Sequence, residues 1–345
     1  MKWLSDQKLD HLRKVVSEPD FSGTKYSIIK ELGSGGMGAV YLAHDRELDR
    51  EVAIKVLHET DLSDDTKRRI LREAQIIAQL EHPGIVPVHD VGSTEDGRVY
   101  YAMKFVRGNR LDEYAATVRT PGDRLRKFKS VCETVAFAHA HGVVHRDLKP
   151  QNIMIGSFGE VLVLDWGIAK VLSPTSLPDS EADTLKLRST NTTFSPTPSH
   201  VTADGTIIGT RHYMSPEQAR GEQIDSRTDV YSLGAVMYFL LTNTAPATRS
   251  DHSSAALPRA VEPSISKAAE AVCLKAMALE RRDRYVSADE LSTDVGHLLD
   301  AEPVSAYREN ILEKTGRWLG KNRFFVLLVL AYLIMRIFFI FTARD

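Results

Sequence analysis

Cysteine is nearly absent from this sequence, whose 345 residues include only Cys132 and Cys273. The two lie far apart and fit neither a disulfide framework nor the spacing of metal ligands. This argues against a disulfide-stapled secreted domain and agrees with a reducing, cytosolic compartment. We expect both cysteines to be ordinary residues of the core or of helix surfaces.

The sequence also has no excess of one charge, and its first residues do not resemble a secretory leader. The formal net charge is −2, so the overall balance gives no reason to expect a nucleic-acid partner. Residues 1–25 form an N-terminal extension without the continuous apolar stretch of a signal peptide. Instead, Trp3, Leu9, Leu12 and Val16 are spaced as in a short amphipathic helix that packs on the rest of the protein.

What is present is a composition with enough apolar residues, 43%, to build a sizeable core. No internal repeat interrupts residues 26–300, in which strand-like and helix-like patterns alternate. Residues 173–206 are rich in Ser, Thr and Pro and are predicted to form a long loop. Residues 301–323 are predicted to be a basic linker, and residues 324–342 are almost wholly apolar.

The order of these patterns predicts an α+β fold with two lobes and a ligand cleft between them. Strand patterns dominate up to residue 105, with one helical face within Asp64–Leu80. The predicted strands are Tyr26–Leu32, Ala39–His44, Glu51–Leu57, Val86–Val91 and Arg98–Phe105. Helical patterns dominate afterwards, at Asp123–Ala140, Arg227–Leu241, Ser266–Leu279 and Ser287–Leu299.

A glycine-rich segment joins the first two predicted strands, in the order Gly33-Ser34-Gly35-Gly36-Met37-Gly38. A dinucleotide-binding loop has the same G-x-G-x-x-G pattern, but it requires a helix directly after the glycines. Here a strand follows, and the next strand ends in Val-Ala-Ile-Lys at Lys55. This arrangement predicts a backbone that closes over phosphates and a lysine that meets their oxygens.

The Lys55 ammonium needs an anion to hold it in place, and Glu73 is the candidate partner. Taken alone, a glutamate on a predicted helix is more often an exposed surface residue. Its position after the Lys55 strand favours the pairing.

The most specific pattern is His145-Arg146-Asp147-Leu148-Lys149-Pro150-Gln151-Asn152. A carboxylate at Asp147 orients an attacking hydroxyl and accepts its proton, and Lys149 neutralises charge on a transferred phosphoryl group. The amide oxygen of Asn152 is a neutral, hard ligand suited to Mg²⁺.

A second metal ligand is predicted at the end of the strand Val161–Leu164, where Asp165-Trp166-Gly167 follows. A carboxylate there, next to a flexible glycine, can chelate Mg²⁺ that bridges two phosphates.

Together these motifs resemble the protein kinase superfamily, most closely the bacterial eukaryote-like (Hanks-type) serine/threonine kinases. The resemblance covers residues 26–300, with a small lobe at 26–105 and a large lobe at 106–300. It implies ATP as the phosphate donor and Mg²⁺, or Mn²⁺ in its place, as the metal. It also implies that Glu217, in Met-Ser-Pro-Glu, forms a buried ion pair with Arg284.

The resemblance also assigns the nucleotide site. The glycine-rich residues, Val40 and Ala53 would surround the nucleotide, and backbone groups near Lys104 and Val106 would hold adenine. This chain has Lys104 where many relatives have Glu, Arg107 where an acidic ribose contact is common, and Trp166 where Phe is usual. The substrate-docking helix after Leu241 is expected to be short, because residues 243–264 show little periodicity.

Lys149 and Thr210 resemble the branch of the family that phosphorylates serine and threonine. The segment from Asp165 to Glu217 is the expected activation loop, and Arg146 could grip a phosphate on it. Thr202 and Thr206 are the candidate phosphorylation sites, although most Ser and Thr of this loop would serve only its solubility. A homodimer would allow one copy to phosphorylate the loop of another.

The C-terminal run Phe324–Phe341 is near the lower length limit for crossing a bilayer, and Arg336 interrupts it. Arg317, Lys321 and Arg323 precede the run and only Arg344 follows it, which favours a kinase on the cytoplasmic side of the inner membrane. We therefore expect a single membrane-spanning helix at 324–342. The alternative is a helix that lies in the membrane interface or pairs with a partner.

Two other functions remain open. The chain could be a nucleotide-binding pseudokinase that acts as a scaffold, although it retains Lys55, Glu73, Asp147, Asn152 and Asp165. It could also phosphorylate a small molecule or lipid, against which the segment from Thr210 to Glu217, a peptide platform in protein kinases, argues.

Overall fold

A computed structural model describes residues 19–35, 38–57, 74–118, 120–166, 210–246 and 256–342. Several predicted features fall outside this part of the chain. They are the N-terminal helix, Gly36, Met37, Glu73, Gly167, Thr202 and Thr206.

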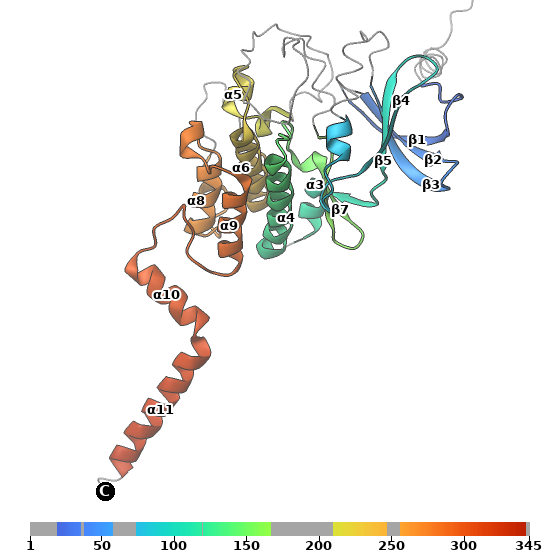
Figure 1. Cartoon of the computed structure of the whole chain (residues 1–345). Helices are drawn as coiled ribbons and strands as arrows, with labels where there is room; N and C mark the ends of the chain where they lie inside the picture. The colour runs from blue at the N-terminus through green and yellow to red at the C-terminus, as the bar shows by residue number, and fades with distance from the viewer. Residues whose placement is uncertain are drawn as a thin grey trace, which may run out of the picture.

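The small lobe is built on a five-stranded antiparallel sheet in the order β1-β2-β3-β5-β4 (Figure 1). All five predicted strands are confirmed, and the fourth lies two residues later than its sequence pattern indicated. The strands are β1 (Tyr26–Gly35), β2 (Gly38–Asp45), β3 (Arg50–Leu57), β4 (Val88–Ser93) and β5 (Val99–Lys104). Residues 74–78 are helical, as expected for the end of the helix predicted at 64–80.

Each face of this sheet buries its own set of side chains, because successive residues of a strand point to opposite faces. One face packs among the small lobe's own residues, including Tyr41, Ile54 and Tyr100. The other face joins the main core that continues into the large lobe, through Ala53, Leu57, Tyr101 and Met103. The second face therefore borders the cleft.

The large lobe begins with a three-stranded antiparallel sheet that carries the motif residues. Its strands are β6 (Gly108–Arg110), β7 (Ile153–Gly156) and β8 (Val161–Val163), in that order. The short helices α3 (Leu111–Thr117) and η1 (Pro150–Asn152) lie beside it. Val163 donates its N–H to the Gly84 carbonyl at 2.8 Å, which ties this sheet to the segment that enters β4.

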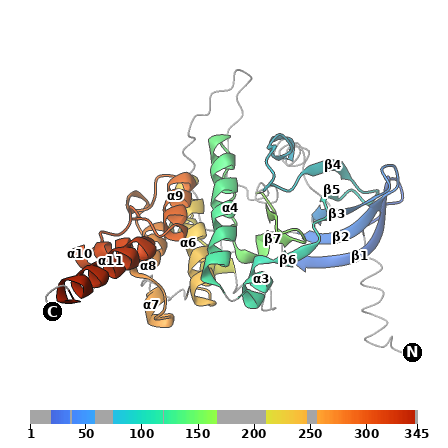
Figure 2. The same cartoon turned by 90° about the horizontal axis from the view of Figure 1, so that it is seen from below.

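Helices form the remainder of the large lobe (Figure 2). α4 (Pro121–Ala140) lies between the sheets and the other helices, and it packs on α6 (Ser226–Thr242) and α9 (Ala288–Leu299). Shorter elements complete this lobe. They are η3 (Thr210–Tyr213), α5 (Pro216–Ala219), α7 (Pro258–Val261), α8 (Lys267–Ala276) and η4 (Arg281–Asp283).

The helix starts follow from the sequence. Thr120, Asp225, Ser266 and Ser287 precede α4, α6, α8 and α9, and each side chain accepts a backbone N–H of the first turn. The predicted helix Ser266–Leu279 ends early, at Ala276. Residues 247–255 of the segment where a short helix was expected lie outside the described residues, and the described part of 243–264 contains the four-residue helix α7.

The predicted ion pair between Glu217 and Arg284 is confirmed and lies buried in the large lobe. Two guanidinium nitrogens of Arg284 donate to the two carboxylate oxygens of Glu217, at 2.7 and 2.8 Å. Burial alone would raise the pKa of Glu217, but the hydrogen bonds and charge of Arg284 outweigh it and hold the pKa below its ordinary value. The pair joins α5 to the segment before α9, which lie far apart in the sequence.

The segment predicted as a linker, residues 301–323, packs partly on the large lobe. Val304 is buried, and the Asp294 carboxylate accepts hydrogen bonds from Ser305 and Ala306. α10 (Ile311–Lys321) follows, with ion pairs from Glu313 to Lys267 and from Arg317 to Glu309.

The apolar C-terminal run is helical, as α11 (Arg323–Thr342), and extends away from the lobes (Figure 1). Across the described ranges, no helix combines the length and the apolar character that crossing a membrane requires. The membrane-spanning helix predicted at 324–342 is therefore not supported.

We predict that Arg284→Ala lowers the free energy of unfolding by about 3–5 kcal/mol, because it leaves the Glu217 carboxylate buried and unpaired. Urea denaturation followed by tryptophan fluorescence measures this loss. Arg282→Ala is the matched control, since Arg282 is an exposed arginine two residues away and should change stability by no more than about 0.5 kcal/mol. Equal losses in the two variants would contradict a special role for the pair.

Candidate active site

The segment from His145 to Asn152 is held in place by the carboxylate of Asp229, a fully buried residue of α6. Its two oxygens accept the backbone N–H of His145 at 2.7 Å and of Arg146 at 2.8 Å. The φ angle of Arg146 is 69°, a left-handed conformation that is unfavourable for residues with a side chain. Asp229 therefore stabilises the strained backbone directly before Asp147.

Asp229 remains ionised although it is buried. Burial would raise its pKa, but the hydrogen bonds that the carboxylate accepts outweigh this effect and lower it. The main contributor is His139 of α4, whose Nε2 lies 2.8 Å from the carboxylate.

Asp147 lies at the centre of a small polar cluster. Lys149 Nζ is 3.0 Å from Oδ2 of Asp147, and the Asn152 amide donates to the Asp147 carbonyl at 2.8 Å. The same amide nitrogen is 3.2 Å from Oδ2. The structure thus brings together the predicted proton acceptor, the predicted phosphate-neutralising lysine and one predicted metal ligand.

Asp165 follows β8 with a left-handed φ of 57°, which marks a second strained residue at the site. Its Oδ1 is 2.8 Å from Lys55 Nζ and 3.3 Å from the Tyr101 hydroxyl. The predicted partner of Lys55, Glu73, lies outside the described residues. Among the described residues, Lys55 pairs with Asp165, the predicted metal ligand.

His145 and Trp166 fill the space beneath these polar groups. His145 Nε2 donates to the Leu164 carbonyl at 2.7 Å, and burial lowers the pKa of this imidazole. The ring of Trp166 lies 4.8 Å from that of His145, and its indole N–H donates to Val163 at 3.0 Å. Trp166 is therefore packed in the core, and its indole makes a hydrogen bond that the usual phenylalanine cannot make.

The glycine-rich segment forms the β1–β2 hairpin, in which Gly35 lies opposite Gly38. A side chain at Gly38 would meet the Val56 carbonyl, so the hairpin can approach β3 only with glycine there. At Gly33 and Gly35 a Cβ would meet nothing within 4 Å. These two glycines leave open space of the kind that phosphates need.

Two of the predicted nucleotide-binding residues, Val40 and Ala53, lie on the cleft face of the sheet. Val40 lies opposite Lys55, and Ala53 lies opposite Met103. Lys104 begins the connection to the large lobe, and its N–H donates to Pro87 at 3.1 Å while its side chain is exposed. Val106 packs against the core two residues later. This geometry leaves the Lys104 carbonyl and the Val106 backbone as the groups to test for contact with adenine.

Arg107 stands where an acidic residue near the ribose is common, and a carboxylate lies beside it. Its guanidinium is 2.6 Å from Glu51 at the start of β3. The ion pair places an acidic side chain beside this position from another strand.

Asp165 and Asn152 fit a Mg²⁺ ion that arrives with a nucleotide. The N–H of Leu164, next to Asp165, donates to the Asn152 carbonyl at 2.8 Å, so the backbone fixes the two residues side by side. The Asn152 amide nitrogen is directed at Asp147, which leaves its amide oxygen as the ligand atom. One carboxylate and one amide are typical of Mg²⁺, which keeps waters and phosphate oxygens as its other ligands.

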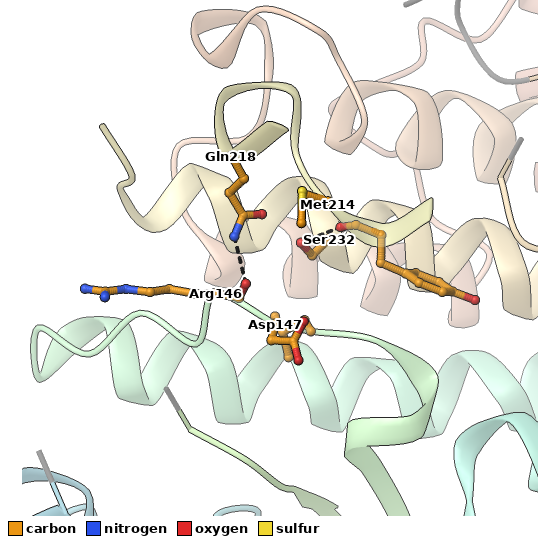
Figure 3. A pocket seen from close by; sticks show the side chains of 7 residues that line it. Arg146, Asp147, Met214, Gln218 and Ser232 are labelled. Carbon is orange, nitrogen blue, oxygen red and sulfur yellow. Dashed lines mark hydrogen bonds between the residues drawn. The ribbon is translucent and has the colours of Figure 1, made fainter. Parts of the chain in front are cut away.

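A small pocket lies between the catalytic segment and α5 (Figure 3). Gln218 crosses it and donates to the Arg146 carbonyl at 2.7 Å, while the Arg146 guanidinium extends away from the pocket. The lining residues are Arg146, Asp147, Leu148, Tyr213, Met214, Gln218 and Ser232.

The contacts that Asp229, Gln218 and Tyr101 make at the site were not predicted from the sequence. No local pattern marks them, because each acts on a residue at least 64 positions away.

We predict that Asp229→Asn destabilises the fold and loosens the catalytic segment, because an amide cannot accept from both backbone N–H groups. Each lost hydrogen bond to a charged acceptor costs about 1.5–3 kcal/mol. Hydrogen exchange of the His145 and Arg146 amides should become faster, and urea denaturation should give the loss of stability. Asp225→Asn, at the exposed start of the same helix, should change neither quantity, since Asn caps a helix as well as Asp.

Comparison with known proteins agrees with this geometry. The chain is 37% identical over 302 residues to the serine/threonine-protein kinase PknD of Chlamydia caviae, an alignment that covers 81% of this chain and 32% of that protein. It is 36% identical over 306 residues to PknD of Protochlamydia amoebophila, with 80% and 30% covered. The chain thus spans about a third of the length of these relatives.

Among solved structures, the kinase domain of Mycobacterium tuberculosis PknI is similar. It superposes with a TM-score of 0.59 at 26% identity, over 79% of this chain and 96% of that one. The sequence pattern of the protein kinase domain matches residues 26–300. The chain therefore belongs to the protein kinase family, and its fold is the bilobal fold of that family.

Proposed function

We propose that this chain transfers the γ-phosphate of ATP to serine or threonine hydroxyls of proteins in a Mg²⁺-dependent reaction. The observation that carries the proposal is the cluster of Asp147, Lys149 and Asn152 beside Asp165 and Lys55. These side chains include the predicted proton acceptor, two lysines placed for phosphate charge and both predicted metal ligands. The similarity to named serine/threonine-protein kinases supports the substrate class.

Each residue has a separate task in this mechanism. Asp147 accepts a hydrogen bond from the substrate hydroxyl, orients its oxygen and takes its proton. Lys149, already 3.0 Å from Asp147, balances negative charge as the phosphoryl group passes. The bound Mg²⁺ would neutralise phosphate charge, and Asn152 and Asp165 would hold it.

Lys55 must change partner during this cycle. In the structure it pairs with Asp165, and contact with the phosphates would draw it away from that carboxylate. The same departure removes the positive charge beside the Asp165 carboxylate, which would favour binding of a metal ion there.

We predict that Asp147→Asn lowers phosphate transfer by about a hundredfold or more, the usual contribution of a general base. The full chain and the variant are incubated with Mg²⁺, ATP and a generic protein acceptor, and phosphate is located by peptide mass spectrometry. Phosphate on serine or threonine from the parent chain alone supports the proposal. An inactive parent whose melting temperature still rises with ATP would favour the pseudokinase scaffold, and transfer to lipid or small-molecule acceptors alone would favour the third function.

The same experiment addresses regulation. We propose that two copies phosphorylate each other's activation loops, at Thr202 or Thr206, in preparation for a phosphate contact with Arg146. Mixing the active chain with a tagged Asp147→Asn chain tests this directly, because phosphate on the tagged chain must come from another copy.

We also propose that α11 holds the chain at the cytoplasmic side of the inner membrane. Apolar side chains along this helix are exposed, among them Phe324, Leu328 and Ile334. An exposed apolar surface of this extent is a typical interaction site. Basic residues precede the helix, and they are attracted to anionic lipid headgroups.

We predict that the chain expressed in bacteria floats with inner-membrane vesicles and that the double substitution Leu328→Glu, Leu330→Glu releases it. Both substitutions replace exposed apolar side chains of α11 and should leave the melting temperature of the catalytic lobes unchanged. Extraction by alkaline carbonate separates a surface-bound helix from an inserted one. A parent chain that remains in the soluble fraction would refute membrane association.

A further inference from the structure

Strand β5 brings a tyrosine hydroxyl to the predicted metal ligand. Tyr101 lies directly opposite Lys55 in the β3–β5 pairing, so the two side chains project from the same face of the sheet. Both reach Oδ1 of Asp165, Lys55 at 2.8 Å and the Tyr101 hydroxyl at 3.3 Å. One carboxylate oxygen thus receives a charged and a neutral donor from neighbouring strands.

The Tyr101 contact lies in the interior of the protein. Tyr101 is 3% exposed and Lys55 is 7% exposed. A buried hydroxyl without a partner is costly, and the Asp165 carboxylate supplies an acceptor for this one. Tyr101 also belongs to the main core, between β3 and β4, so its ring has a fixed position.

We propose that Tyr101 is a positioning residue for the metal site. Its hydroxyl holds Oδ1 of Asp165, so that the other carboxylate oxygen is presented to nucleotide-bound Mg²⁺. The use of Asp165 as a metal ligand rests on the proposed function. Nothing in the motifs assigns this task to a residue of β5.

The need for such a residue arises from the change of partner by Lys55. When the lysine moves to the phosphates, Asp165 loses its charged donor, although its backbone is in an unfavourable left-handed conformation. The Tyr101 hydroxyl remains, because it is carried by a central strand of the sheet. As a neutral donor it orients the carboxylate and leaves its negative charge available to the metal, which an ammonium at the same place would cancel.

The chain supplies a matched control in the adjacent residue. Tyr100 is 5% exposed and lies on the same strand, but it points to the opposite face, where its ring packs on Phe21 and Tyr26. Tyr100→Phe and Tyr101→Phe each remove one hydroxyl from a buried tyrosine of β5. Only the second removes a contact with Asp165.

We predict that Tyr101→Phe weakens metal binding to the ADP complex by about three- to tenfold, as expected for a long hydrogen bond to a charged acceptor. The probe is Mn²⁺, and the loss of its free electron paramagnetic resonance signal measures binding to the full chain with ADP, in a mild detergent because α11 exposes apolar side chains. Tyr100→Phe should bind Mn²⁺ like the parent. Affinity for ADP without metal should be the same in all three proteins.

Three outcomes would overturn this assignment: unchanged Mn²⁺ affinity in Tyr101→Phe, equal weakening in both variants, or no Mn²⁺ binding to the parent complex. A parallel loss of metal-free ADP affinity would also overturn it, since that result points to general damage of the site. Because binding is measured without phosphate transfer, a chain that fails to phosphorylate proteins can still show the Tyr101 effect. Where transfer is active, the Mg²⁺ concentration for half-maximal rate should rise in Tyr101→Phe alone.

Discussion

The buried carboxylate of Asp229 connects the helical scaffold to the chemistry of the site. It accepts hydrogen bonds from two successive backbone amides, and His139 of a second helix contacts the same carboxylate. The backbone it holds is strained at Arg146, and the residue after Arg146 is Asp147. Without this carboxylate the loop would relax toward ordinary backbone angles, and Asp147 would lose its alignment with Lys149 and Asn152. The helices of the large lobe therefore reach the catalytic segment through Asp229 of α6 and through Gln218 of α5, which donates to the Arg146 carbonyl.

A second set of constraints comes from the sheets. The pairing of β7 with β8 places Asn152 beside Leu164, so that the two predicted metal ligands come from adjacent backbone positions. The pairing of β3 with β5 places Lys55 and Tyr101 on one face. In both cases strand register, rather than a flexible loop, determines which polar atoms meet. The strand pairings therefore bring the charged residues of the site within hydrogen-bonding distance, although many residues separate them in the sequence.

Much of this arrangement could be predicted from the sequence. Alternation of apolar residues gave the strands of the small lobe, and the spacing around Asp147 gave the catalytic segment. The ion pair of Glu217 with Arg284 followed from the family resemblance. The contacts of Asp229, Gln218 and Tyr101 could not be predicted, because they depend on register and helix packing between distant segments. The contact of Lys55 with Asp165 was not predicted for a related reason. Sequence order alone does not show which carboxylates of a cleft lie within reach of a lysine. The packing of residues 301–310 was missed because Asp294 of α9 binds their backbone, which composition does not reveal.

Trp166 has a consequence for compounds directed at this protein. In the kinase family the aromatic residue at this position sets the active or inactive state by its packing. Here the indole is 3% exposed and is hydrogen-bonded to Val163, so moving it outward breaks that bond and uncovers a larger ring than phenylalanine. An unpaired buried donor or acceptor costs about 1–3 kcal/mol. Inhibitors that occupy the space left by a displaced ring should therefore lose affinity for this chain relative to kinases with phenylalanine, whereas inhibitors that fill only the adenine region should not.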